Sequence, residues 1–164
     1  MTREPGTYAL ILESTQRADV VVGRLGVLAL QSGYYVYVGS AFGPGGLAAR
    51  VGRHAQPSKR EHWHIDHVRA RCSFIEVWFT CDRQPLEHHW AAAMARLSGA
   101  SVPMPGFGSS DCDCPTHLFR FNNRPKIESF RRILGVTPAH SPIGRKASQL
   151  RRQHLSAIPG SPSA

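Results

Sequence analysis

The chain has 164 residues, of which 41% are hydrophobic, and it carries a formal net charge of +9. This length suits one domain with a modest core and is too short for two ordinary domains. The longest apolar runs fall short of the roughly 18 residues that a membrane helix needs. The first residues also lack the apolar core of a signal peptide, so we expect a cytoplasmic protein with no membrane partner.

The positive charge lies mainly at the end of the chain. Residues 125–164 hold seven Lys or Arg and one Glu, so they carry +6 of the +9. We expect a domain over residues 1–124, then a short apolar-faced helix near Ile127 to Leu134 and a largely disordered basic tail. Basic charge favours a polyanionic partner, most simply DNA. The tail is either a phosphate-binding arm or a solvated terminus without function.

The first third of the chain has the pattern of a small, mostly antiparallel sheet. Residues 6–12 form an apolar run, and residues 20–22 and 27–30 are two shorter runs with glycines between them. Residues 34–38 then form an aromatic run that ends at Gly39. Apolar runs bounded by turn residues are typical of strands, so four strands are predicted here.

The rest of the domain alternates helices and strands. The sequence predicts helices over residues 47–54, from about residue 62, and over 85–97, with strands over 73–80 and 117–121. Proline and glycine mark residues 102–116 as a loop. The predicted fold class is α/β, a small and mainly antiparallel sheet flanked by helices.

Four side chains could supply the chemistry of phosphodiester cleavage. The reaction needs an aligned water, a cation on the phosphate, and a metal or acid at the leaving oxygen. Tyr8 and Tyr37 each offer a phenol oxygen to a water, and Arg50 offers forked donors to a phosphate. Glu87 offers a hard oxygen ligand to Mg²⁺. His54 follows Arg50 by four residues and shares a neighbouring helix face.

Alternatives stay open for three of these residues. Tyr37 lies in an aromatic run and could simply pack there with its hydroxyl at the surface. Arg53 competes with Arg50 for the phosphate, and the face shared with His54 favours Arg50. Glu87 could merely complement the positive end of its helix.

Taken together, these residues resemble the GIY-YIG nuclease superfamily. The resemblance covers about residues 6–121 and rests on Gly6-Thr7-Tyr8, Tyr37-Val38-Gly39, Arg50, His54 and Glu87. Segments that begin at Gly39, His62 and Gly106 are similar to a subfamily found alone or beside a DNA-repair endonuclease or glycosylase domain. Two departures are a Thr in place of the Ile of the first motif and a longer segment between Tyr8 and Tyr37, which accommodates a hairpin.

The resemblance implies a three-stranded antiparallel sheet flanked by helices, and DNA cleavage with one divalent ion, Mg²⁺ or Mn²⁺. It implies that Tyr8 and Tyr37 position or deprotonate the water, Arg50 stabilises the phosphate and Glu87 holds the metal. His54 would carry a proton or contact the phosphate. The expected supporting residues are Gly39, Ser40, His62, His64 and Asp66.

Histidine and cysteine are concentrated in two segments that could hold a metal. His62, His64, Asp66 and His67 form one, and Cys112, Cys114 and His117 form the other. Nitrogen and sulfur ligands suit zinc, but the spacing matches no familiar zinc finger. A structural or polar-network role for these residues is the alternative.

The sequence therefore predicts a metal-dependent DNA endonuclease or nickase, with DNA repair as its setting. The alternative is a catalytically weak nucleic-acid-binding module that uses the same cleft and the basic tail. Cutting both strands of a duplex with one active site needs a second copy or a second encounter, so a homodimer is left open.

Overall fold

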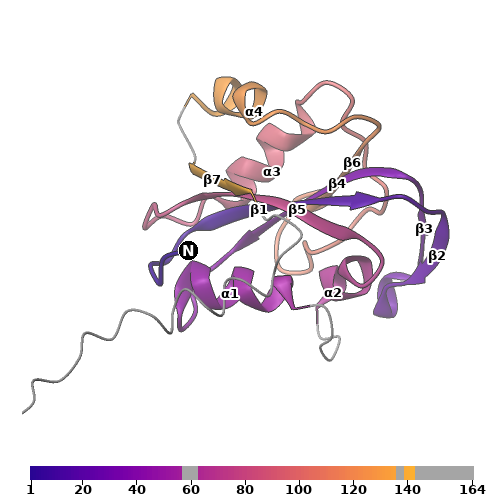
Figure 1. The fold of residues 1–164 in the computed structure, drawn as a ribbon, viewed down its shortest axis with the longest axis horizontal. Helices are drawn as coiled ribbons and strands as arrows, with labels where there is room; N and C mark the ends of the chain where they lie inside the picture. The colour runs from indigo at the N-terminus through magenta and orange to yellow at the C-terminus, as the bar shows by residue number, and fades with distance from the viewer. Residues whose placement is uncertain (57–62, 136–138, 143–164) are drawn as a thin grey trace, which may run out of the picture.

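The computed structural model describes residues 1–56, 63–135 and 139–142 (Figure 1). The strands and helices, in chain order, are β1 (Thr7–Ser14), β2 (Ala18–Val21), β3 (Val27–Leu30), β4 (Gly33–Ser40), α1 (Gly46–Ala55), α2 (His64–Arg69), β5 (Ser73–Thr80), α3 (Glu87–Ala95), β6 (Leu118–Phe121), α4 (Ile127–Leu134) and β7 (Ala139–Pro142), with a single 3₁₀ turn at Gly23–Leu25.

The strands form one five-stranded antiparallel sheet in the order β6-β4-β1-β5-β7. Strands β2 and β3 form a separate two-stranded hairpin, which lies between β1 and β4 in the sequence but not in the sheet. The predicted α/β class with a mainly antiparallel sheet and an inserted hairpin is confirmed. The sheet is wider than the three strands that the resemblance implied, because β6 and β7 pair with the outer edges of β4 and β5.

Alternation along β1 produces two apolar layers, one on each face of the sheet. Tyr8, Leu10 and Leu12 belong to one buried cluster, and Ala9 and Ile11 belong to the other. Successive side chains of a strand point to opposite faces, so a strand buried on both sides reads as a continuous apolar run. Figure 1 shows the consequence, a sheet with α1 and α2 on one face and α3 and α4 on the other.

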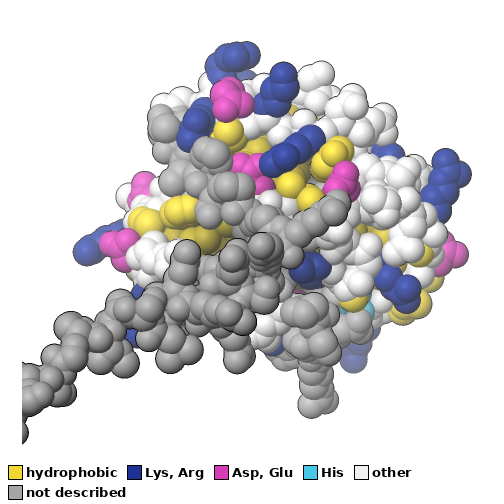
Figure 2. All heavy atoms as spheres, viewed as in Figure 1, with side chains coloured by type: hydrophobic (Ala, Val, Ile, Leu, Met, Phe, Trp, Pro, Cys, Tyr) yellow, Lys and Arg dark blue, Asp and Glu magenta, His cyan; other side chains and the backbone are white. Residues whose placement is uncertain are grey.

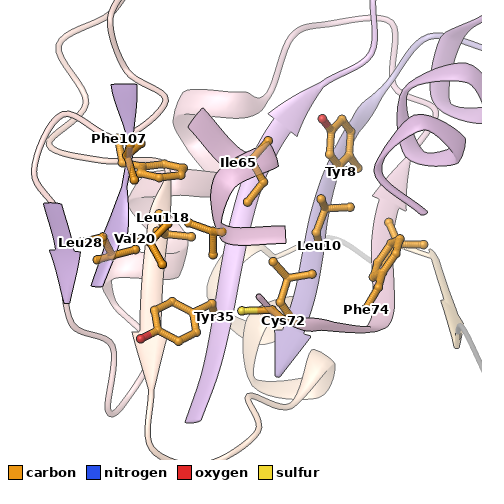
Figure 3. Packing of buried hydrophobic residues seen from close by; sticks show 14 of the residues in the cluster. Tyr8, Leu10, Val20, Leu28, Tyr35, Ile65, Cys72, Phe74, Phe107 and Leu118 are labelled. Carbon is orange, nitrogen blue, oxygen red and sulfur yellow. The ribbon is translucent and has the colours of Figure 1, made fainter. Parts of the chain in front are cut away.

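The face covered by α1 and α2 also carries the hairpin and part of the long loop before β6. Figure 3 shows this cluster, with Tyr8 beyond Leu10 on β1, and Phe107 on the side of the hairpin residues Val20 and Leu28. Phe107 is fully buried. The loop over residues 102–117 is therefore anchored in the core, although it contains no helix or strand.

The predicted boundary at residue 124 requires correction. The helix expected near Ile127 to Leu134 is present as α4, but it packs on the sheet and does not belong to a tail. Its Phe130 ring centroid lies 5.4 Å from that of Trp78 on β5, and β7 pairs with β5 beyond it. An apolar stripe on an amphipathic helix needs a partner to be buried, and the sheet provides it. The folded unit thus continues to Pro142, while residues 143–164 lie outside the described residues.

Within the described part of the chain, every helix is too short or too polar to span a bilayer.

Candidate functional site

A cavity of about 350 Å³ lies where the start of β1 and the end of β4 meet the neighbouring helices. It is lined by Tyr8, Tyr37, Ser40, Arg50, Trp63, His64, Glu87, Gly108, Ser110 and Asp111. The structure thus brings together Tyr8, Tyr37, Arg50 and Glu87, which come from four different elements. The expected supporting residues Ser40 and His64 line the same cavity, whereas His62 lies outside the described residues.

Gly39 creates the space that the Tyr8 ring occupies. The two residues face each other across the β1–β4 ladder. A Cβ atom on Gly39 would lie 2.6 Å from Tyr8 Oη and 3.1 Å from Tyr37 Cε1. The first distance is shorter than real Cβ contacts and the second is tight, so glycine lets both tyrosine rings lie against the strand backbone.

A chain of polar contacts runs from Tyr8 away from the cavity. Tyr8 Oη and His54 Nε2 share a buried hydrogen bond of 2.9 Å. On the other side of the imidazole, Asp66 Oδ1 lies 3.9 Å from Nδ1. Asp66 Oδ2 accepts hydrogen bonds from Arg53 Nη2 at 2.9 Å and from the Trp63 backbone N–H at 3.1 Å. His54 therefore holds the Tyr8 hydroxyl on the side away from the cavity, and Asp66 lies beyond His54. Both residues are almost fully buried.

Both tyrosines stay neutral at physiological pH. Burial raises the pKa of Tyr8 well above its usual value, and the neighbouring Tyr37 raises it further. Burial also raises the pKa of Tyr37, and the carboxylate of Glu87 adds to the effect. A phenolate is disfavoured away from water and near negative charge. Each phenol can therefore donate a hydrogen bond and accept one.

The choice between Arg50 and Arg53 follows from their partners. Both guanidinium groups lie over Trp63, each with Cζ 4.5 Å from the ring centroid. Arg53 forms an ion pair with Asp66, whereas Arg50 lines the cavity. Stacking on an indole favours a planar cation and restricts its rotamers. Trp63 thus orients Arg50, a role that the sequence alone did not suggest.

Glu87 is placed by the contact between α3 and β1. The backbone N–H of Leu86, the residue before the helix, donates to Thr7 Oγ1 at 3.1 Å. Thr7 is fully buried. The Thr7 hydroxyl therefore fixes the start of α3. Glu87 itself is 21% exposed, and its Oε1 lies 3.1 Å from Nδ1 of the buried His117.

The loop before β6 supplies cavity residues that the sequence analysis did not single out. Asp111, Ser110 and Gly108 line the cavity, and Asp111 adds a second carboxylate to that of Glu87. The Gly108 backbone N–H donates to His64 Nδ1 at 3.4 Å. Burial lowers the pKa of His64, and the neighbouring His67 lowers it further, which favours the neutral ring. The motif at Gly106 already contained these residues, but nothing in it distinguished cavity residues from turn residues.

A second cluster of polar side chains lies beside the cavity and contacts Glu87 through His117. It consists of His88, Cys112, Cys114 and His117, whose nearest ligand atoms all lie within 4.8 Å of one another. The last three are candidates that the sequence predicts, whereas His88, the second residue of α3, is not among them. His64 and Asp66 lie elsewhere, at the cavity wall and behind His54. Among the residues that the structure describes, His64 and Asp66 therefore do not join this cluster.

Comparison with known proteins identifies one family. A family described as a domain of unknown function, DUF123, matches residues 7–135. The match spans the strands β1 to β6, the helices α1 to α4 and the cavity residues. No curated protein and no solved structure matches the chain.

Proposed function

This chain belongs to the DUF123 family, and we propose that it is a metal-dependent DNA endonuclease or nickase that hydrolyses phosphodiester bonds. One observation carries the proposal: two neutral tyrosines, an arginine and a glutamate from four elements line one cavity. These are the residues to which the resemblance to GIY-YIG nucleases assigns the water, the phosphate and the metal. DNA repair would be the setting that the same resemblance suggests.

Tyr8 and His54 suit a proton relay. As a water attacks phosphorus, its proton passes to Tyr8 Oη while Tyr8 passes its own proton to His54 Nε2, 2.9 Å away. Tyr8 then never needs to exist as a phenolate, which agrees with its raised pKa. Asp66 lies on the far side of the imidazole and stabilises the positive charge that the ring acquires. Tyr37 lines the same cavity and offers a second phenol to the attacking water.

Arg50 is the group that would bind the scissile phosphate. It is the arginine that lines the cavity, and its stacking on Trp63 holds the guanidinium in the wall. A guanidinium can donate two parallel hydrogen bonds to phosphate oxygens. Charge that develops on these oxygens in the transition state would strengthen both bonds, which is how such a group lowers the barrier.

The carboxylates at the cavity fit a hard divalent cation. Glu87 would hold the ion, and Asp111 is a second carboxylate on the same cavity. Mg²⁺ and Mn²⁺ favour oxygen ligands and are bound in such sites by one or two carboxylates and waters. When bound, the ion supplies positive charge at the leaving oxygen. The hydrogen bond from Leu86 to Thr7 keeps Glu87 at the cavity whether or not an ion is bound.

Nicking of supercoiled plasmid and of a branched duplex, with Mg²⁺ or Mn²⁺, tests the proposal. We expect metal-dependent cleavage by the wild-type chain. Tyr8→Phe, Arg50→Ala and Glu87→Gln should each lower the rate by about 10²-fold or more, since each removes a group that acts in the transition state. The ratio of nicked to linear product reports whether one strand or two are cut.

Two variants serve as matched controls and should retain wild-type rates. Tyr34→Phe removes a phenol from β4 on the opposite face of the sheet. Glu128→Gln neutralises an exposed first-turn carboxylate on α4. If the wild-type chain cuts no faster than the three site variants, yet binds DNA with a steep salt dependence, the enzyme proposal fails. The nucleic-acid-binding module then describes the protein better.

A further inference from the structure

We infer that His88, Cys112, Cys114 and His117 bind one zinc ion, and that this ion fixes the loop that forms one wall of the cavity. The site is separate from the magnesium position proposed at Glu87. It uses different ligand atoms and a different kind of metal, and it would be present whether or not the chain cuts DNA.

The distances suit a single tetrahedral ion. Zinc binds Cys sulfur at about 2.3 Å and His nitrogen at about 2.0 Å, so neighbouring ligand atoms of a tetrahedron lie about 3.3 to 3.8 Å apart. His88 Nδ1 lies 3.2 Å from Cys114 Sγ, and Cys112 Sγ lies 3.5 Å from His117 Nε2. One ligand atom from each of the four residues lies within 4.8 Å of the other three. This spread is too compact for a two-iron cluster, whose ligands surround two metal atoms.

The ligand types also select the metal. Two thiolates and two imidazoles form the Cys₂His₂ set of structural zinc sites, in which protein ligands occupy all four positions. Thiolates discriminate against Mg²⁺ and Mn²⁺, which favour oxygen. The cation proposed for catalysis would therefore not compete for this cluster.

Glu87 supports the ligand His117 from outside. With Nε2 of His117 turned toward Cys112, its Nδ1 lies 3.1 Å from Glu87 Oε1. A carboxylate beside the second ring nitrogen is the usual support for a zinc-bound histidine, because it sets the tautomer and the ring orientation. Glu87 then contacts the zinc site through one oxygen and lies in the cavity wall at the same time.

A metal at this position would explain how a long irregular loop keeps a defined shape. Residues 102–117 contain no helix or strand, yet they place Gly108, Ser110 and Asp111 at the cavity. Phe107 anchors the middle of the loop in the core. The proposed ion would anchor its far end, because it joins Cys112 and Cys114 to His88 on α3 and to His117 just before β6.

Metal analysis of the full chain tests the inference. Protein purified without chelator and without added zinc should hold close to one zinc per chain. After removal of the metal, cobalt should restore the site with the strong visible absorption of a tetrahedral, thiolate-bound ion. With zinc bound, only the exposed Cys81 should react quickly with a thiol reagent, and removal of zinc should expose Cys112 and Cys114 as well.

Variants with matched controls identify the ligands. Cys112→Ser, Cys114→Ser and His88→Asn should each weaken zinc binding by at least about 10-fold. Cys81→Ser and His89→Asn change the same residue types at exposed positions outside the cluster, and they should retain one ion. If a variant fails to fold, cobalt titration of the metal-free wild-type chain still tests the site.

Three results would overturn the inference. The first is a folded wild-type chain that neither retains zinc nor binds added zinc or cobalt. The second is full zinc binding by the cluster variants, and the third is a resident metal other than zinc. Because each readout is metal content, absorption or thiol reactivity, a chain that fails to cut DNA leaves this test unaffected.

Discussion

Gly39 is the residue on which the geometry of the paired tyrosines depends most directly. It has no side chain where Tyr8 and Tyr37 approach the backbone of β4, and it faces Tyr8 across the ladder. In the sequence it reads as a glycine that ends an aromatic strand. Its role depends on the pairing of β1 with β4, because the ring that fills the space comes from a residue 31 positions earlier.

We expect Gly39→Ala to lower the rate of DNA cleavage by about 10²-fold, because the added Cβ would displace Tyr8 from His54. Overpacking should also lower the free energy of unfolding by about 1–3 kcal/mol. Plasmid nicking and thermal unfolding measure the two effects. Gly43→Ala is the control, since its Cβ would have its nearest contact at 3.8 Å, an ordinary distance. Wild-type activity in Gly39→Ala would argue against a catalytic role for Tyr8.

Helix α1 shows how one element divides its residues between the core and the cavity. Leu47, Val51 and His54 are buried at helical spacing, and Arg50 lies on the adjoining side at the cavity. The placement of Leu47 and Val51 in the core and of Arg50 on another face was predictable from the sequence, because contacts within a helix follow a fixed period. His54 was expected on the face of Arg50, but it is buried and bonded to Tyr8. The partner of each residue was not predictable, since Trp63 and Asp66 come from the next helix and its N-terminal end.

The two glycines of α1 should respond to alanine in opposite ways. Gly52 is exposed in the middle of the helix, and a Cβ there would meet nothing within 4 Å. We expect Gly52→Ala to raise the free energy of unfolding by about 0.5–1 kcal/mol, because alanine has less backbone freedom to lose. Gly46 has φ +56°, and its Cβ would collide with the carbonyl oxygens of Arg3 and Glu4. Gly46→Ala should therefore destabilise the fold, and denaturant unfolding measures both. A destabilising Gly52→Ala would contradict this view of α1.

At the scale of the whole molecule, much of the positive charge lies outside the sequence range that supplies the cavity residues. On the face shown in Figure 2, the visible Lys and Arg side chains are scattered among Asp and Glu. Residues 143–164 carry four of the basic side chains, Arg145, Lys146, Arg151 and Arg152, and no acidic residue. The last described strand of the sheet, β7, ends at Pro142. The proposed binding of DNA and the proposed cleavage of one bond can therefore be tested independently.

A chain that ends after Pro142 should keep its fold and weaken its DNA binding. If the four basic residues neutralise phosphates, the slope of log affinity against log salt should become shallower by about 0.9 for each phosphate that they no longer neutralise. Cleavage at saturating DNA should change little, because the cavity residues remain. A full-length variant with these four residues changed to Gln controls for chain length. An unchanged salt slope would identify the segment as a solvated terminus.

The sequence by itself determined the fold class, the bounds of most strands and helices, and the identity of Tyr8, Tyr37, Arg50 and Glu87 as candidates. Apolar periodicity and glycine turns are local, so they can be recognised without knowing which elements are neighbours. Only the tertiary structure placed the four candidates around one cavity, assigned Arg53 to Asp66 and joined His88 to Cys112, Cys114 and His117. It also extended the domain past residue 124, because the apolar stripe of α4 is buried only against a sheet built from earlier residues. Such contacts join residues far apart in the chain, and their distances depend on how the sheet and helices pack together.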